Sequence, residues 1–568
     1  MSSYTGFTLH RILRRLRRDI KLWRSWTINY LNRHVFGSWH KLGRSKWLVA
    51  SWGFLVAVSL WGLLAQIGAL NSIANQDLPQ RGGIYREALL GQVKSVNPLF
   101  ADNAATEDVN SLVFSGLTKI NGDREIVADL AEKWDVSADK KSYVFHLRKD
   151  LKWQDGIKLT AKDVAFTVGL VQNPDTRSPL AANWNGVKYE VVDDATIKFI
   201  LPSSYGNFLF NTSLGILPKH KLETVKASSL RSNEFNQKPV GSGPYKLDFL
   251  EVDSTVIDLS ANQDYYIHEP YIPKIRIDLY QSNQEIISAL ISKKVDAASA
   301  ISPLDVATVE KIQNITNHRI NLPAYVGAFF NFKSPVLSDL KVRQALAYAA
   351  DRKSIVENEL GGGATIAYYP IPAGFVGFNP KAERYETDQK KAKELIAASG
   401  VSKANLRIVT LNNPIYEKVA SNLANSWRAL GLNVEVIAAD SVQLQQNYIR
   451  SRNYDVLLYG QNVGLDSDVY SFWHSSQAVD PGLNVSVFKN SEVDQLLEAG
   501  RLAKDQSYKA SRYSAFVEKW ANDAPAVILY SPYYNYAQSD FVKGFDAKKV
   551  AEPSNRFYNI YDWYFAKQ

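Results

Sequence analysis

The most apolar stretch of the chain is the run WLVASWGFLVAVSLWGLLAQIGAL at residues 47–70, and no charged residue lies between Lys46 and Asp77. As a helix, these 24 residues would be about 36 Å long, enough to cross a hydrocarbon core of roughly 30 Å. The run follows a basic segment, which favours a cytoplasmic N-terminus. The pattern therefore predicts one transmembrane anchor with the body outside the cytoplasm, either periplasmic or at the cell surface.

A cleaved signal peptide is the alternative interpretation, with Ser72 and Ala74 at the −3 and −1 positions of the cleavage site. The long basic region and the long apolar run both speak against it. Within residues 1–46, apolar positions of segment 9–31 recur at three- and four-residue steps with arginines between them. This spacing predicts a basic amphipathic helix on the inner leaflet, or else a solvated tail that only sets the orientation.

After a polar linker at 71–80, the pattern changes to short β-branched and aromatic runs that alternate with helical periodicity. Alternating strands and helices predict an α/β body. The expected strands are 83–90, 196–201, 274–280, 405–411, 433–439 and 454–460. The expected helices are 339–360, 418–431 and 491–504.

The chain has 568 residues, 46% of them apolar and 22% charged, which is typical of a globular protein. Its net charge of +9 comes from the N-terminus, where residues 1–46 hold eleven basic residues and one acidic residue, a net +10. The remaining residues therefore carry about −1, which gives no reason to expect nucleic-acid binding.

Catalytic and metal-binding patterns do not emerge from the sequence. No cysteine is present, so thiol chemistry, cysteine-ligated zinc, iron–sulfur clusters and a lipid-modified cysteine are excluded. The body holds five widely spaced histidines, and the chain has neither a P-loop nor a G-x-S-x-G motif. We therefore expect a protein that is not an enzyme, with no cofactor and no metal.

Six blocks, in the same order, resemble the family 5 extracytoplasmic solute-binding proteins of peptide-type ABC importers. The most specific block, 130–168, contains Trp134, Trp153 and the turn Asp155-Gly156, followed by Thr160 as a helix N-cap. The other blocks are RGGIYREALLGQVKSVNPLF (81–100), LVFSGLTKI (112–120), GSGPYKL (241–247) with ANQDYY (261–266), VRQALAYAADR (342–352) and DAPAVILY (523–530).

The resemblance implies a two-lobed fold of the type II periplasmic binding protein class with an extra subdomain. We expect the segments that cross between the lobes near 273–281 and 521–530. Lobe I would then comprise 80–115, 187–275 and 527–568, the inserted subdomain 116–186, and lobe II 278–523. The ligand would lie between the lobes.

The ligand loop departs from the family pattern. Peptide-binding members have G-W-x-A-D after the strand that resembles 454–460, and its aspartate pairs with the peptide ammonium. Here Gln461 and Gly464 replace the tryptophan and the aspartate. Asp466 could take over this role, although it and Asp468 could equally cap the following helix. The implied ligand-binding residues are Asn462, Gly464, Asp466, Tyr470 and Trp473.

The family resemblance implies a membrane-anchored, monomeric peptide-binding subunit that delivers its ligand to ABC permease subunits. The missing acid at Gly464, with Tyr470, Phe472 and Trp473 nearby, keeps open a non-peptide solute such as an oligosaccharide. A solute sensor without a transporter is a further alternative.

Overall fold

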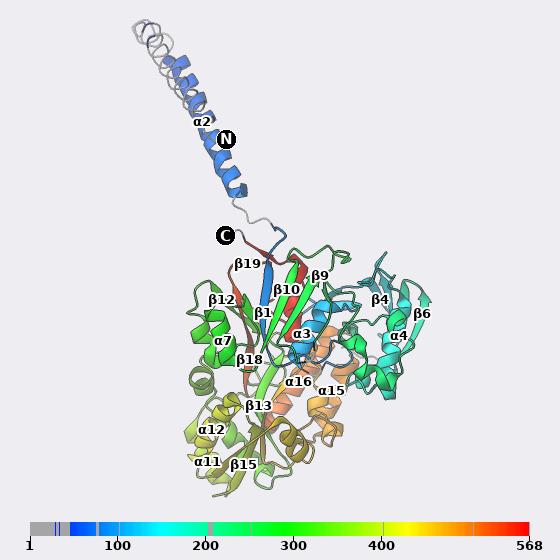
Figure 1. Ribbon diagram of the computed structural model, residues 1–568. Coiled ribbons are helices and arrows are strands. Elements are labelled where there is room, and N and C mark those ends of the chain that lie inside the picture. Colours follow the sequence, from blue (N-terminus) through cyan, green and yellow to red (C-terminus); the bar gives the residue numbers. More distant parts are fainter. Residues whose placement is uncertain are drawn as a thin grey trace. The chain divides into compact units, whose positions relative to one another are not determined.

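The computed structural model describes residues 46–74 and 79–566, apart from positions 102, 203–207, 252, 402 and 504, together with Asn29 and Arg33 (Figure 1). The chain divides into two compact units, Met1–Leu78 and Pro79–Gln568. Each unit is described by itself below.

The first unit contains helix α2, Lys46–Ala74, whose 29 residues include the whole expected span 47–70. Its large apolar side chains Trp47, Trp52, Phe54 and Trp61 are exposed. Among the residues that the structure describes, none forms a helix both long and apolar enough to cross a membrane. The amphipathic helix expected at 9–31 lies outside the described residues, except for the single position Asn29.

The second unit is built on a mixed sheet whose long strand β18, Ala526–Ser539, belongs to both of its halves. In the first half the strand order is β8-β9-β10-β1-β11-β18, and β12 also pairs with β18. The bounds are β1 Ile84–Leu90, β8 Tyr245–Leu247, β9 Val256–Ala261, β10 Lys274–Tyr280, β11 Ala297–Ala298 and β12 Ile315–Asn321. Helices α3 Ala104–Val113, α5 Phe208–Asn211, α6 Lys219–Leu222, α7 Asn283–Ile291 and α8 Val306–Val309 belong to this half of the chain. This half is lobe I.

The second half of the sheet has the order β16-β15-β17-β13-β18, with β14 also on β18. The bounds are β13 Ala324–Phe330, β14 Ala364–Ile366, β15 Asn405–Leu411, β16 Asn433–Ala439 and β17 Val456–Asn462. Apolar side chains of β13, β17 and β18 alternate between two separate cores, so this sheet is buried on both faces. The helices of this half, lobe II, are α9 Leu340–Ala349, α10 Arg352–Ser354, α11 Gln389–Ser399, α12 Pro414–Arg428, α13 Ser441–Gln443, α14 Tyr470–Trp473, α15 Ser491–Leu502 and α16 Gln506–Asp523.

The two lobes are joined by two crossing segments, and both differ from the expected 273–281 and 521–530. Strand β12 pairs with β18 from Tyr533 onwards, whereas β13 and β14 pair with β18 up to Pro532, so the crossings are Leu322-Pro323 and Pro532-Tyr533. The expected second crossing, 521–530, is the end of α16 and the lobe II part of β18. The expected crossing at 273–281 is instead β10, a strand within lobe I that pairs in parallel with β1 along its whole length. Residues up to Asn321 therefore belong to lobe I, and the expected start of lobe II at residue 278 is wrong.

The inserted subdomain also extends further than the expected 116–186. Its four-stranded sheet has the order β4-β5-β7-β6, built from β4 Ala131–Val136, β5 Ser142–Leu147, β6 Lys188–Asp193 and β7 Thr196–Ile200. Helix α4, Ala161–Gln172, is part of this subdomain, and the β2–β3 hairpin, Thr118–Ile120 and Ile126–Ala128, precedes it. The boundary at 186 would separate β6 and β7 from β5, with which β7 pairs.

Local predictions hold best where they rest on caps and turns. Thr160 forms a capping box with Asp163 at the start of α4, and Gly156 has the positive φ of a tight turn, 87°. Gly241 is needed because a Cβ there would lie 1.9 Å from the Val113 carbonyl oxygen. The helix expected at 339–360 is interrupted, since Asp351 starts a new turn by accepting from the Ser354 N–H.

Candidate ligand-binding site

The loop with the predicted ligand residues begins at the end of β17, beside a lobe crossing. The Val463 N–H donates to the Pro323 carbonyl at 2.7 Å, and Asn462 Nδ2 donates to the lobe I carbonyl of Ala551 at 3.3 Å. Asn462 Oδ1 accepts from the Gly464 N–H at 2.9 Å, and Gly464 adopts a φ of 73°. Asn462 therefore lies at the junction of the lobes, with Gly464 held beside it.

Gln461, which stands where the family has tryptophan, is an internal residue. Its side chain is buried, and its Oε1 accepts from the Tyr325 hydroxyl at 2.6 Å. The amide thus satisfies a buried tyrosine inside lobe II and does not offer an aromatic surface to a ligand.

Asp466 already has a cationic partner. Lys509 Nζ on α16 donates to both carboxylate oxygens at 2.6 Å, and the two side chains are only 16% and 15% exposed. The same ammonium lies 5.7 Å from the centre of the Tyr513 ring. A ligand ammonium that reached Asp466 would have to share it with Lys509 or displace Lys509.

Asp468 caps the helix that follows the loop, which is one of the two roles considered for it from the sequence. Its Oδ1 accepts from the Tyr470 N–H at 3.1 Å at the start of α14, and its Oδ2 accepts from Arg501 Nε at 2.7 Å. The carboxylate therefore caps α14 and ties it to α15.

The two predicted aromatic residues differ in position. Tyr470 is half-buried, stacks on His474 with ring centres 4.0 Å apart, and lies under the Arg501 guanidinium at 3.9 Å. Trp473 is 1% exposed and packs between Phe329 and Trp520 in a lobe II core. Tyr470 is thus partly accessible, with its ring held between His474 and Arg501, whereas Trp473 is part of the core.

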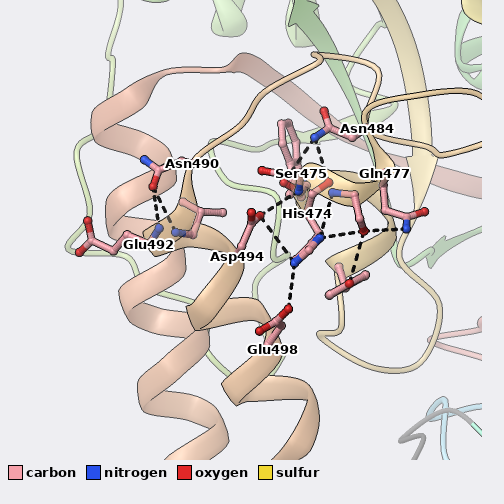
Figure 2. A network of polar contacts seen from close by, with 12 residues as sticks. His474, Ser475, Gln477, Asn484, Asn490, Glu492, Asp494 and Glu498 are labelled. Carbon is pink, nitrogen blue, oxygen red and sulfur yellow. Dashed lines mark hydrogen bonds and ion pairs between the residues drawn. The ribbon is translucent and has the colours of Figure 1, made fainter.

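A polar network after α14 joins this loop to α15 (Figure 2). His474 Nε2 lies 3.2 Å from Glu498 Oε1, and the Ser475 N–H donates to Asp494 Oδ1 at 2.8 Å. His474 Nδ1 accepts from the Ser476 N–H at 3.1 Å, so this ring nitrogen serves as a helix cap. The His474 imidazole lies between the Ser476 hydroxyl and the Glu498 carboxylate, and these bonds fix the segment that follows α14.

A second feature, which sequence reasoning missed, is a solvent-accessible cavity of about 260 Å³ in lobe I. Its lining includes Glu107 and Asn110 from α3, Glu552 from the C-terminal segment, and Tyr558 and Tyr561. Glu107 and Asn110 are three residues apart, so they share a face of α3. Two polar residues on one face of this helix are the signal that the sequence offers for the cavity.

Buried Arg556 fixes the two elements that carry these carboxylates. Its Nη1 and Nη2 bind both oxygens of Asp108 on α3 at 2.7 and 2.8 Å, and Nη2 also binds Glu87 on β1 at 2.8 Å. Because Arg556 and Glu552 belong to one short C-terminal segment, this ion-pair network holds Glu552 against α3.

Among the described residues, no group of three or more His, Asp or Glu side chains is placed to hold a metal ion. The side chains described at the lobe junction and in the lobe I cavity are hydrogen-bonding, charged and aromatic ones.

Comparison with known proteins identifies a family and several similar structures. Residues 125–481 match the family described as bacterial extracellular solute-binding proteins, family 5 (middle region). The oligopeptide-binding protein AppA of Bacillus subtilis is 29% identical over 512 residues, 86% of this chain and 93% of AppA. Its structure in complex with a nonapeptide has a TM-score of 0.72 at 28% identity and covers 86% of this chain and 100% of that chain.

Two further solved structures are similar over most of both chains. The ABC transporter substrate-binding protein CtaP from Listeria monocytogenes has a TM-score of 0.78 at 27% identity, over 86% of this chain and 100% of that one. NikZ from Campylobacter jejuni, solved with Ni(L-His), has a TM-score of 0.72 at 27% identity, over 85% and 99%. Because the family match covers more than half of the chain, this protein belongs to the bacterial extracellular solute-binding proteins of family 5.

Proposed function

We propose that this protein is the substrate-binding subunit of an ABC importer, and that its body captures peptides between the two lobes and delivers them to the permease. The observation that carries this proposal is the similarity to AppA, solved with a nonapeptide, over 86% of this chain. The two short crossings support it, since two rigid lobes can rotate about such segments while each core stays intact.

Contacts between the lobes are suited to opening and closing. The Arg124 guanidinium of the β2–β3 turn lies 5.1 Å from the ring centre of Phe375 in lobe II, and Asn462 reaches Ala551 in lobe I. A ligand shifts such an equilibrium only by binding the closed form better. We place the peptide against Asn462, Gly464, Asp466 and Tyr470, with Trp473 behind them.

A non-peptide solute is the second candidate, and one observation favours it. Asp466, the nearest replacement for the family's ammonium partner, is already bound to Lys509. An uncharged ligand such as an oligosaccharide needs no such partner at Asp466.

Ligand identification decides between the two. The purified full-length protein in detergent should carry peptides that native mass spectrometry detects, and isothermal titration calorimetry should show that added peptides compete for the same site. Detection of a bound sugar or another solute, with no response to peptides, would favour the second candidate and refute the first.

We further propose that the body acts as a monomer and that residues 47–70 anchor it in the membrane, with residues 1–46 in the cytoplasm. The uncharged run, the basic segment before it and the exposed aromatic side chains of α2 support this arrangement. Protease added to spheroplasts should degrade the body while an N-terminal tag survives on a membrane-bound fragment. Release of an intact soluble body that starts at residue 75 would instead indicate cleavage after Ala74.

A further inference from the structure

The lobe I cavity brings together two carboxylates without a cation. Glu107 and Glu552 both line it, and among the described residues no basic side chain forms an ion pair with either. Glu552 and Asn555 form a capping box, in which the Glu552 N–H donates to Asn555 Oδ1 at 2.9 Å. Burial, reinforced by the charges of Glu552 and Asp108, raises the pKa of Glu107 to about 7. Burial raises the pKa of Glu552 as well.

Asn110 supplies an independent observation. Asn110 is 7% exposed and lines the same cavity, yet among the described residues neither its Oδ1 nor its Nδ2 has a hydrogen-bond partner. A buried amide left without partners destabilises the fold, so such groups are rare in native proteins. The free Oδ1 is an acceptor that, like the two carboxylates, suits a donor brought by a ligand.

One basic residue, Lys119, lines the cavity, and its ammonium binds groups other than Glu107 and Glu552. Lys119 Nζ donates to the Tyr558 carbonyl at 3.1 Å and to the Tyr561 hydroxyl at 3.0 Å, and it lies 3.7 Å from Asp129. Lys119 therefore balances Asp129, and Glu107 and Glu552 remain as the surplus negative charge.

We propose that this cavity is a subsite for a positively charged nitrogen group of the bound ligand, held by Glu107, Glu552 and Asn110. The inference rests on the proposed function, and the group would be a lysine or arginine side chain or the α-ammonium of a peptide. A volume of about 260 Å³ lies below the usual 300–1,000 Å³ of small-molecule pockets, so it suits one side chain better than a whole peptide. Tyr558 and Tyr561 provide aromatic surface for the methylene stem and the charge.

Four peptides test the subsite on the full-length protein in detergent: Lys-Ala-Lys-Ala-Lys and Gln-Ala-Gln-Ala-Gln, each with a free or an acetylated amino terminus. A lysine subsite predicts that the acetylated lysine peptide binds more tightly than the acetylated glutamine peptide by about tenfold or more. An ammonium subsite predicts the same preference for the free over the acetylated glutamine peptide. Either preference should vanish in Glu107→Gln combined with Glu552→Gln.

The matched control is Glu190→Gln, which removes one negative charge from an exposed position of the inserted subdomain outside the cavity. It should keep the wild-type preference. Equal binding of all four peptides to the wild type, or equal weakening of all four by the double variant, would overturn the subsite alone. Absence of binding by every peptide would overturn the proposed function as well.

A second readout needs only the wild type and so does not depend on folding of a variant. A cation beside Glu107 lowers the pKa of this carboxyl, so binding of the preferred peptide at about pH 6 should release protons. Calorimetry in two buffers of different ionisation enthalpy measures this release, which should be larger than for the acetylated glutamine peptide. Equal proton release for the two peptides would contradict the proposal.

Discussion

The ion pair between Asp466 and Lys509 decides what the predicted ligand loop does. Breaking one partner of a fully buried pair typically costs about 3–5 kcal/mol, while an exposed pair contributes about 0–1 kcal/mol. Both side chains are about one-sixth exposed, and both carboxylate oxygens are bonded at 2.6 Å. We therefore expect Asp466→Asn to lower the free energy of unfolding by about 2 kcal/mol.

The matching substitution on the other side of the pair is Lys509→Met, which leaves Asp466 without its cation. Together with the double variant, the two substitutions form a cycle that isolates the interaction. We expect a coupling energy of about 1–2 kcal/mol, so the double variant should be more stable than the sum of the single effects predicts. Urea unfolding of the full-length protein, followed by tryptophan fluorescence, measures all four free energies.

The same variants test the ligand role of Asp466. If Lys509 is its native partner, Asp466→Asn leaves the ratio of affinities for free and N-acetylated peptides unchanged in calorimetry. Two results together would refute this reasoning: no change in stability on Lys509→Met, and loss of the distinction between free and acetylated peptides in Asp466→Asn. Asp466 would then be the ammonium partner that the family pattern implies.

Three further predictions concern lobe I. Because the pKa of Glu107 is raised from 4.5 to about 7 in the folded protein, the stability that this group contributes is present below about pH 4.5 and lost as the pH rises towards 7. Glu107→Gln should therefore gain stability relative to wild type over this window, by at most about 3 kcal/mol in urea unfolding. Arg556→Met leaves Glu87 and Asp108 buried without a cation and should lower the free energy of unfolding by about 3–5 kcal/mol. Adding Glu87→Gln and Asp108→Asn should restore part of this stability. No recovery would contradict the ion-pair explanation. Gly241→Ala should lower the thermal midpoint of unfolding, because its Cβ would lie 1.9 Å from the Val113 carbonyl oxygen. Gly374→Ala, at a position with open space but a φ of 86°, should lower it less. Equal effects of the two substitutions would refute the argument from this contact.

The sequence predicts those elements whose cause is local. Strand β10 alternates strictly between half-buried and buried positions, as its pattern KIRIDLY indicates, and the family blocks correctly imply two lobes. Its place in the fold could not be predicted in the same way. Whether β10 crosses between lobes or lies inside lobe I depends on its pairing with β1, about 190 residues earlier in the sequence. Pairing at that distance leaves no trace in the pattern of either strand.

The same limit applies to the site. The loop 460–468 and its departure from the family pattern can be found from the sequence, because the strand before it is recognisable. The partner of Asp466 cannot be found from the sequence, because Lys509 lies 43 residues later and is brought to Asp466 by the packing of α16. Glu107 and Glu552, 445 residues apart, line one cavity, and the ion pair between Arg556 and Asp108 joins the two elements that carry them.

Two neighbouring carboxylates on helix α3, Asp108 and Glu107, differ in their surroundings. Asp108 is 2% exposed and meets both guanidinium nitrogens of Arg556, as expected of a charge buried for stability. Its neighbour Glu107 lines the cavity, and within the part of the chain that the structure describes it has no cationic partner, nor do the two polar side-chain atoms of Asn110 have a hydrogen-bond partner. The chain thus neutralises one carboxylate and leaves the next one to repel Glu552, at a cost in stability that burial makes larger. A cation bound at the proposed subsite relieves this repulsion and gives the amide oxygen a donor, so both effects contribute binding energy for a positively charged group.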